Sequence, residues 1–242
     1  MRLPQGKILH VPELESTQDE LARWVRSGNR AVVGVRADHQ TSGRGRLGRS
    51  WLTPPGEALA LSLALYPYAD WKQPQLLGMA VALAAARALD LLLQWPNDLV
   101  LETSDGIRKA GGVLAEMTPT GEGRVPVVGI GVNLTVREFP PGLSFATSLA
   151  LAGRSTPTAE QAQQLILSAL SEAPEPTAWS ALSGLWMERD RTPGKRYLYG
   201  DIPTEATGVD DEGRLLLSTG DGVVAVPSAE AWYGDDSRFA GA

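Results

Sequence analysis

The sequence contains no cysteine, and this absence limits the chemistry that the protein can use. Without thiols there is no disulfide, no thiolate metal site and no cysteine-bound acyl intermediate. Long apolar runs are also missing, because the most apolar helical stretch, residues 76–93, is interrupted by Arg87 and Asp90. The first residues lack the apolar core of a signal peptide. We therefore expect a soluble, cytoplasmic protein.

Positive charge is scarce as well. Twenty-two Lys and Arg residues stand against 28 Asp and Glu residues, which gives a formal net charge of −6. This balance disfavours a general affinity for nucleic acid, because such proteins normally present a basic face. The hydrophobic fraction of 43% is ordinary for a globular protein, and 242 residues suffice for one large domain with a small appendage.

Periodicity and turn residues predict a mixed sheet packed with helices in the first part of the chain. Capping-box sequences at Thr17 and Thr158 predict helix starts, and in the first box we expect the Thr17 hydroxyl and the Glu20 carboxylate to reach back across the first turn. Pro74 begins an Ala/Leu-rich helix to about residue 89, and a further helix is predicted over 179–189. Short apolar runs between Gly and Pro predict strands at 31–36, 59–65, 91–95, 99–102, 112–117 and 125–132.

The segment Thr192-Pro193-Gly194 marks the expected domain boundary. Beyond it, hairpin-like turns separate short predicted strands at 197–199, 205–209, 214–218 and 222–226. The fold class is therefore α/β (α+β). We predict a catalytic domain over residues 1–191 and a small C-terminal β-barrel over residues 192–242.

The chemically most distinctive segment is Gly43-Arg44-Gly45-Arg46-Leu47-Gly48-Arg49-Ser50-Trp51. Its glycines let the backbone approach phosphates, and guanidinium groups bind phosphate oxygens in pairs. Trp51 offers a flat surface for a purine. A solvated basic turn, or an RGG-like contact with nucleic acid, is the alternative that the residues alone leave open. The segment also lacks the Lys-Ser/Thr ending of a nucleoside-triphosphate P-loop.

Three further segments combine polar side chains with turns or glycines. Gln94-Trp95-Pro96-Asn97-Asp98 ends a predicted strand with a polar pair, although an ordinary turn has the same composition. Lys109 stands before Gly111-Gly112, where it could meet a carboxylate or phosphate, or simply lie on the surface of a hairpin. The strand Gly129-Ile130-Gly131-Val132-Asn133 has glycines at alternate positions, which either clear space for a ligand or mark a bulge.

In their order and spacing, these four segments resemble the motifs of the biotin–protein ligase family, which run GRGRxGRxW, KWPND, KxGGxLxE and GxGxN. Ser16-Thr17 is similar to the biotin-side Ser-Thr of that family, and Gln40 to its glutamine ahead of the arginine loop. The residues around 208–217 resemble its small terminal domain. Gln94 departs from the motif, which has lysine there. The segment before Ser16 is too short for the helix-turn-helix domain of some members, so the resemblance implies a form without it.

The resemblance implies an ATP-dependent ligase that forms biotinyl-5′-AMP from biotin and ATP. The enzyme would then transfer biotin to a lysine of a biotin carboxyl carrier protein. Lys109 and Arg44 would be catalytic. The implied biotin-binding residues are Ser16, Thr17, Gln40, Gly43, Arg44, Lys109, Gly111, Gly112 and Gly129. The implied ATP- or adenylate-binding residues are Arg46, Arg49, Trp51, Asn97, Asp98 and Asn133.

The same resemblance implies that Mg²⁺ is held mainly by the phosphates, without firm protein ligands. The expected partners are the carrier protein, biotin and ATP, with no DNA and no membrane, and a homodimer is left open. An acyl-adenylate hydrolyses when water reaches it, so we expect residues 43–49 to be mobile without ligand and to close over the intermediate.

Two rival functions remain at this point. A lipoate–protein ligase would share the fold, and the lack of cysteine excludes only versions with a cysteine acyl-enzyme. The complete arginine loop with its terminal tryptophan favours biotin. A non-enzymatic module that grips RNA or DNA with the basic loop is the rival of a different class, and the net negative charge disfavours it.

Overall fold

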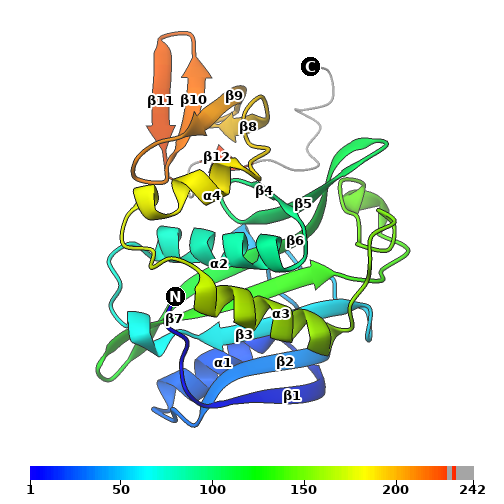
Figure 1. Ribbon diagram of the computed structural model, residues 1–242, viewed down its shortest axis with the longest axis vertical. Coiled ribbons are helices and arrows are strands. Elements are labelled where there is room, and N and C mark those ends of the chain that lie inside the picture. Colours follow the sequence, from blue (N-terminus) through cyan, green and yellow to red (C-terminus); the bar gives the residue numbers. More distant parts are fainter. Residues whose placement is uncertain (228–230, 233–242) are drawn as a thin grey trace.

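The computed structural model describes residues 1–227 and 231–232, which form a helix-covered sheet with a smaller sheet at one end (Figure 1). The large sheet has seven strands in the order β1-β2-β3-β7-β6-β5-β4, and the small sheet has five in the order β11-β10-β9-β8-β12. Strands β1 and β2 run parallel, whereas the other neighbours in the large sheet are antiparallel. The predicted fold class, a mixed sheet with helices followed by a small β domain, is confirmed.

The large sheet and its helices take up most of the chain. Their bounds are β1 (Lys7–Leu14), α1 (Thr17–Arg26), β2 (Val32–Gln40), β3 (Ala58–Ala64), α2 (Pro74–Ala88), β4 (Leu92–Gln94), β5 (Asp98–Thr103), β6 (Gly106–Thr120), β7 (Gly123–Asn133), α3 (Ala159–Glu172) and α4 (Ser183–Met187). Strand β1 has no counterpart among the predicted strands. The helix predicted over 179–189 is a 3₁₀ turn, Trp179–Ala181, followed by the short α4.

The two faces of the large sheet are covered differently. Helices α2 and α3 lie on one face, where Val128, Ile130 and Val132 of β7 join the main core. Helix α1 packs on the opposite face, against a smaller cluster that includes Val125 and Val127 of the same strand. Because strand side chains alternate between faces, β7 contributes to both layers.

The first helix begins differently from the prediction. Ser16 is the N-cap, and its hydroxyl accepts a hydrogen bond from the backbone N–H of Asp19 at 3.4 Å. The Glu20 carboxylate does not reach back; it accepts from Trp24 Nε1 at 3.0 Å and pairs with Arg23 at 2.7 Å. The predicted Thr17 capping box is therefore wrong, because Ser16 already caps the helix and Thr17 has buried partners elsewhere. The Thr158 box is present, with both of its hydrogen bonds to Gln161 formed.

The small sheet is the predicted C-terminal β domain. It consists of β8 (Arg196–Tyr199), β9 (Ile202–Val209), β10 (Leu215–Thr219), β11 (Gly222–Val226) and β12 (Ala231–Trp232), all joined by antiparallel pairs. Within the described residues the pairs follow the order β11-β10-β9-β8-β12, and none joins β11 to β12. The predicted small β domain is therefore present as an antiparallel sheet, and its closure into a barrel stays a prediction. Positions 228–230 and 233–242 of the predicted domain lie outside the described residues. The boundary at residue 192 stays a prediction.

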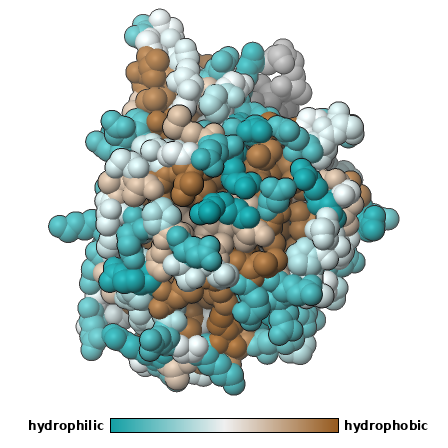
Figure 2. All heavy atoms as spheres, in the orientation of Figure 1, coloured by the Kyte–Doolittle hydropathy of each residue, from teal (hydrophilic) through white to brown (hydrophobic). Residues whose placement is uncertain are grey.

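Exposed apolar side chains of the described chain are spread over several elements and include Leu47, Met187 and Ile202. Apolar residues follow β11 at the top of the face in Figure 2, where Val223 is 60% exposed. None of the helices in the described part of the chain is long and apolar enough to cross a membrane.

The buried position of α2 predicts a large stability effect. Leu77 is fully buried in the main core, so Leu77→Ala should leave a cavity and lower the free energy of unfolding by about 2–5 kcal/mol. Urea denaturation followed by circular dichroism measures the change. The matched control is Leu165→Ala on α3, whose side chain is 47% exposed. Equal losses in the two variants would contradict the assigned core.

Candidate active site

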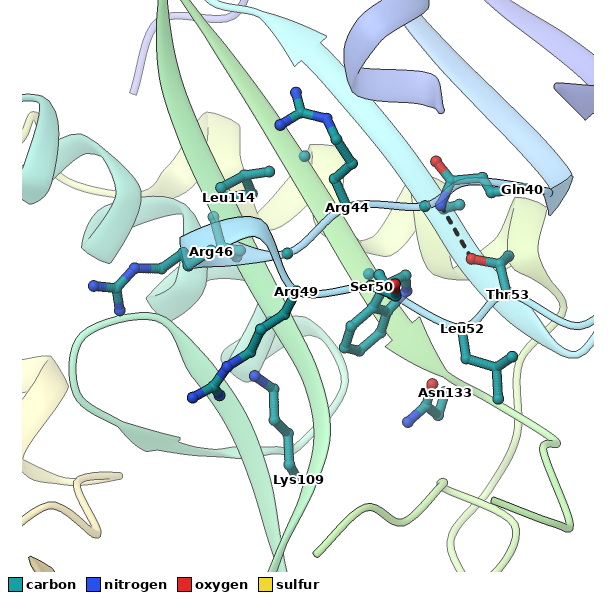
Figure 3. A pocket seen from close by; sticks show the side chains of 18 of the residues that line it. Gln40, Arg44, Arg46, Arg49, Ser50, Leu52, Thr53, Lys109, Leu114 and Asn133 are labelled. Carbon is teal, nitrogen blue, oxygen red and sulfur yellow. Dashed lines mark hydrogen bonds between the residues drawn. The ribbon is translucent and has the colours of Figure 1, made fainter. Parts of the chain in front are cut away.

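A cavity of about 790 Å³ lies on the face of the large sheet that α2 and α3 leave free, beside the start of α1. Every predicted site residue except Gly111 lines it. The predicted residues in its wall are Ser16, Thr17, Gln40, Gly43, Arg44, Arg46, Arg49, Trp51, Asn97, Asp98, Lys109, Gly112, Gly129 and Asn133. Figure 3 shows side chains from the arginine loop, β6 and the end of β7 gathered around this space. The fold thus brings together four segments that are far apart in the sequence.

The floor of the cavity is built by residues without bulky side chains on β3 and β7. Ala60 pairs with Gly131 and Ser62 with Gly129, and all four line the space. A Cβ atom on Gly131 would lie only 2.5 Å from Cε2 of Trp51, and one on Gly129 would lie 2.9 Å from Oε1 of Gln18. The pairing of β7 with β3 and β6 continues without a shift through these positions. The alternate glycines therefore clear space and do not mark a bulge.

Lys109 reaches the cavity because β6 carries a bulge. Opposite β5, Leu99 pairs with Gly111 but Val100 pairs with Lys109, which leaves Ala110 as the extra residue. Ala110 is buried in the main core, and the bulge places Lys109 on the same face as Gly112. A Cβ on Gly112 would lie 3.4 Å from Cε of Lys109, so the lysine stem runs along the bare glycine.

Gly111 has a different role from the one expected. It is not part of the cavity wall. A Cβ on this residue would lie 2.6 Å from the carbonyl oxygen of Gly131 and 3.1 Å from Cδ1 of Leu99. Gly111 therefore allows the close packing of β6 against its neighbours, because it stands next to the bulge and faces away from the cavity.

A network of buried polar side chains forms the end of the cavity beside α1. The backbone N–H and the hydroxyl of Thr17 donate to Oε1 of Gln40 at 2.8 and 3.0 Å. Nε2 of Gln40 donates to Thr53 at 3.0 Å, the hydrogen bond drawn as a dashed line in Figure 3. The Thr17 hydroxyl also lies 2.9 Å from that of Ser62, which donates to Oε1 of Gln18 at 3.1 Å. The two hydroxyl protons serve three contacts, so one of these contacts has no proton between its oxygens. A hydroxyl oxygen can accept two hydrogen bonds, so Thr17 and Ser62 have acceptor capacity in this network.

Arg44 is held by two carboxylates that lie on different elements. Its guanidinium donates to Asp19 of α1 at 2.8 and 3.1 Å and to Glu116 of β6 at 2.9 and 3.3 Å. Hydrogen bonds to Glu116 and then to Asp19 raise the pKa of Arg44 above its usual value. The arginine loop is thereby tied to both α1 and the sheet.

The loop itself folds back as a small antiparallel hairpin. The N–H of Trp51 donates to the carbonyl of Gly43 at 2.8 Å, and the N–H of Gly45 donates to that of Arg49 at 2.7 Å. A Cβ on Gly43 would lie 2.4 Å from the Trp51 carbonyl oxygen, so the base of the hairpin requires glycine. Figure 3 shows the three arginine side chains leaving the loop in different directions, with Arg49 on the side of Lys109. Mobility of residues 43–49 without ligand stays a prediction.

Cationic and polar groups converge at the other end of the cavity. Nη1 of Arg46 donates to the Asn97 side-chain oxygen at 3.0 Å, and Nζ of Lys109 lies 2.6 Å from the Asp98 carboxylate. The same Nζ lies 6.0 Å from the centre of the Trp51 ring, a distance suited to a cation–π contact. Burial lowers the pKa of Arg46, and the charge of neighbouring Arg49 acts in the same direction, whereas Asp98 opposes them.

Asn133, at the end of β7, is buried. Its side-chain amide donates to the Thr147 carbonyl at 2.9 Å.

Several residues of the cavity were not predicted. The segment 139–146, attached to β6 through a hydrogen bond from the Lys109 N–H to Phe145 O at 2.9 Å, carries no motif that would have revealed it. Gln18 and Tyr197 gave no signal either. Ala58, Ala60 and Ser62 alternate with leucines along β3, and this pattern of small residues could have indicated a cleared face.

Gln94, which departs from the motif lysine, is buried and does not line the cavity. Its Nε2 lies 3.5 Å from the Tyr197 hydroxyl and donates to it. No group of three or more His, Asp or Glu side chains in the described residues could hold a metal ion.

Comparison with known proteins agrees with this geometry. Residues 15–133 match the model of the biotin/lipoate A/B protein ligase family. The chain is 32% identical to the bifunctional ligase/repressor BirA of Bacillus spizizenii, over 93% of this chain and 72% of that protein. It is 30% identical to the biotin–[acetyl-CoA-carboxylase] ligase of Mycobacterium tuberculosis, over 88% of this chain and 83% of that one.

The fold has solved counterparts as well. The structure of biotin protein ligase from Aquifex aeolicus in complex with biotin and ATP superimposes with a TM-score of 0.76 at 27% identity, covering 93% of this chain and 97% of that one. Sequence, fold and the cavity with its four motifs agree, and the chain therefore belongs to the biotin protein ligase family, within the broader biotin/lipoate A/B protein ligase family.

Proposed function

We propose that this protein forms biotinyl-5′-AMP from biotin and ATP and then transfers biotin to a lysine of a biotin carboxyl carrier protein. The observation that carries this proposal is the composition of one cavity, in which a buried polar network lies at one end and a cluster of cations at the other. Aquifex aeolicus biotin protein ligase, with a similar fold, was solved with biotin and ATP bound.

The end beside α1 suits the head group of biotin. A ureido group offers two N–H donors and one carbonyl acceptor. The hydroxyls of Thr17 and Ser62 can accept a hydrogen bond from such an N–H. Both of their protons point to glutamine oxygens, so no proton lies between the two hydroxyl oxygens. The small residues Ala60 and Ser62 and the glycines opposite them leave the cavity wide enough for apolar rings. We infer that biotin enters with its ureido group toward α1 and its carboxylate toward Lys109.

Adenylate formation joins two anions. The carboxylate oxygen of biotin attacks the α-phosphorus of ATP, a P–O bond breaks, and pyrophosphate leaves. Repulsion between carboxylate and triphosphate is the main obstacle, so catalysis depends on positioning and on positive charge in a site that excludes water. Lys109, Arg46 and Arg49 line the part of the cavity where these groups would meet. We assign Lys109 to the meeting point of carboxylate and α-phosphate.

The adenosine is expected between Trp51 and Asn133. Trp51 lies directly against Gly131, so its indole is held as a flat surface at the cavity wall. Asn97 and Asp98 hold Arg46 and Lys109 in place before the nucleotide arrives. Both side chains would therefore act through these cations.

Arg44 suits a role at the closed loop. Its contacts with Asp19 and Glu116 connect the loop to both walls of the cavity. An adenylate beneath the loop would be shielded from water until the carrier lysine arrives. That amine then attacks the activated carbonyl carbon, the bond to the phosphate oxygen breaks, and AMP leaves.

Magnesium would arrive with the nucleotide. The two oxygen-bearing side chains at the cationic end, Asn97 and Asp98, already pair with Arg46 and Lys109. A preformed protein cage for a hard cation is therefore not what these residues provide, and a phosphate-held ion fits them better. When bound, the ion would neutralise charge on the phosphates.

The rival functions fit less well. The matched family includes lipoate ligases, but the named relatives act on biotin. The repressor activity in the name of the Bacillus relative belongs to that protein, and the proposal for this chain concerns the ligase reaction. The absence of DNA binding, a homodimer and a cytoplasmic location stay predictions.

Incubation with biotin, MgATP and a carrier domain tests the proposal directly. We expect the carrier mass to rise by one biotinyl group, and biotin to support ATP–pyrophosphate exchange better than lipoate. A carrier with its acceptor lysine replaced by arginine is the control. Exchange with lipoate alone would identify the rival ligase, and salt-dependent nucleic-acid binding without ATP turnover would identify the binding module.

Removal of the central cations should slow adenylate formation without unfolding the protein. For Lys109→Ala we expect biotin-dependent pyrophosphate exchange to fall by about 10²–10³-fold, as for the loss of one preorganised charge-stabilising group. Arg44→Ala should also lower biotin-dependent pyrophosphate exchange. Lys72→Ala, at an exposed lysine outside the cavity, is the control. Thermal unfolding checks the folds, and unchanged exchange in both variants would remove these residues from the site.

Substitution of Gly131 should weaken ATP binding more than biotin binding. In Gly131→Ala the new Cβ would meet the Trp51 ring at 2.5–2.8 Å, so the indole must move. We expect the KM for ATP to rise several-fold while the Kd for biotin changes little. Gly121→Ala, where nothing lies within 4 Å of the new atom, is the matched control. A larger loss of biotin affinity than of ATP affinity would show that Trp51 supports the binding of biotin and not that of the nucleotide.

A further inference from the structure

Tyr197 is a cavity residue that comes from the C-terminal sheet. It lies on β8, is fully buried, and in the described ranges 1–227 and 231–232 it is the only residue beyond position 146 that lines the cavity. The part of the site expected to bind the nucleotide therefore includes a side chain that belongs to the small sheet and that no motif indicated.

The hydroxyl of Tyr197 is attached to the Gln94–Trp95 segment. It donates to the Trp95 carbonyl at 2.8 Å and accepts from Nε2 of Gln94 at 3.5 Å. The two aromatic rings meet edge to face, with centres 5.9 Å apart. Burial raises the pKa of Tyr197 well above its usual value, so the phenol keeps its proton and stays a donor.

Trp95 is held by the C-terminal part of the chain at two further points. Its backbone N–H donates to Oγ1 of Thr192 at 2.9 Å, and its indole N–H donates to the Gly213 carbonyl at 3.0 Å. Thr192 is in turn fixed by Asp190, which accepts from its backbone N–H at 2.9 Å. The carbonyl, the amide and the ring of this tryptophan are therefore all bonded to residues after position 191.

The residues that follow Trp95 hold the cations of the site. Asn97 contacts Arg46 at 3.0 Å, and Asp98 contacts Lys109 at 2.6 Å. Any displacement of the Trp95 carbonyl passes through Pro96 to these two side chains. The geometry thus connects the position of the small sheet with the position of two cations that face the substrates.

We propose that Tyr197, anchored by Gln94, is a positioning residue that sets the Pro96–Asp98 turn and thereby the nucleotide end of the site. Gln94 suits this place because a neutral amide can donate to the phenol, whereas a charged side chain would need to be desolvated there. The expected effect on the KM for ATP rests on the proposed ligase function. The expected effect on the position of the Pro96–Asp98 turn does not.

The kinetic test compares three variants of the full chain. Tyr197→Phe keeps the ring and removes the hydroxyl, and we expect the KM for ATP to rise by about fivefold to tenfold, since a buried carbonyl loses its donor. The Kd for biotin should stay within twofold. Gln94→Leu should act in the same direction, and the double variant should add little to Tyr197→Phe. Tyr199→Phe, at an exposed tyrosine on the same strand, is the control.

Amide hydrogen exchange tests the positioning without any substrate. Tyr197→Phe should speed exchange at Trp95, Asn97 and Asp98 relative to wild type, with no change in β1 or α1. Exchange at wild-type rates there would overturn the inference whatever the enzyme does. The inference would also be overturned if the KM for ATP in Tyr197→Phe equalled that of the wild type. The same holds if the KM for ATP and the Kd for biotin rose by equal factors. If the wild-type chain showed no biotin-dependent ATP–pyrophosphate exchange, that result would instead overturn the proposed function.

Discussion

The site depends on the alternation of side chains along β7. On one face, Val128, Ile130 and Val132 pack under α2 and α3. On the other face, Gly129 and Gly131 leave room for the side chains of Gln18 and Trp51, which line the cavity. The same backbone thus supports the core and opens the site. A one-residue change in register would bring the branched side chains into the cavity and leave the glycines in the core. The long, unbroken pairing of β7 with β3 and β6 prevents such a slip.

The positive charges of the site are held by partners before any ligand binds. Arg44 pairs with Asp19 and Glu116, Lys109 pairs with Asp98, and Arg46 bonds to Asn97. Such pairs keep cations close together in a chain whose formal net charge is −6. They also fix the side chains in one arrangement, so less reorganisation is needed when anionic substrates approach. Phosphate oxygens can then take the place of carboxylate oxygens around the same guanidinium and ammonium groups.

The small sheet is part of this arrangement and not an isolated appendage. Trp95 donates hydrogen bonds to Thr192 and Gly213, and the Tyr197 hydroxyl donates to the Trp95 carbonyl. The Pro96–Asp98 turn, at the end of the cavity where we propose that the nucleotide binds, therefore has one side on the large sheet and the other on the small sheet. The buried amide of Gln94 belongs to this junction, which explains why a residue of the second motif lies outside the cavity.

The sequence by itself determined the order of most helices and strands and the family, because periodicity and short motifs are local properties. Every site residue it predicted except Gly111 lies in the cavity wall, although other residues of the wall carried no motif. The sequence could not decide which of Ser16 and Thr17 caps the first helix, since both fit a capping pattern. Only the buried contacts of Thr17 with Gln40 and Ser62 show that Thr17 is used elsewhere. Tertiary structure also decided that Lys109 faces the site and Gly111 does not. That outcome follows from a bulge at Ala110, which arises from pairing with another strand and leaves no mark on the local sequence.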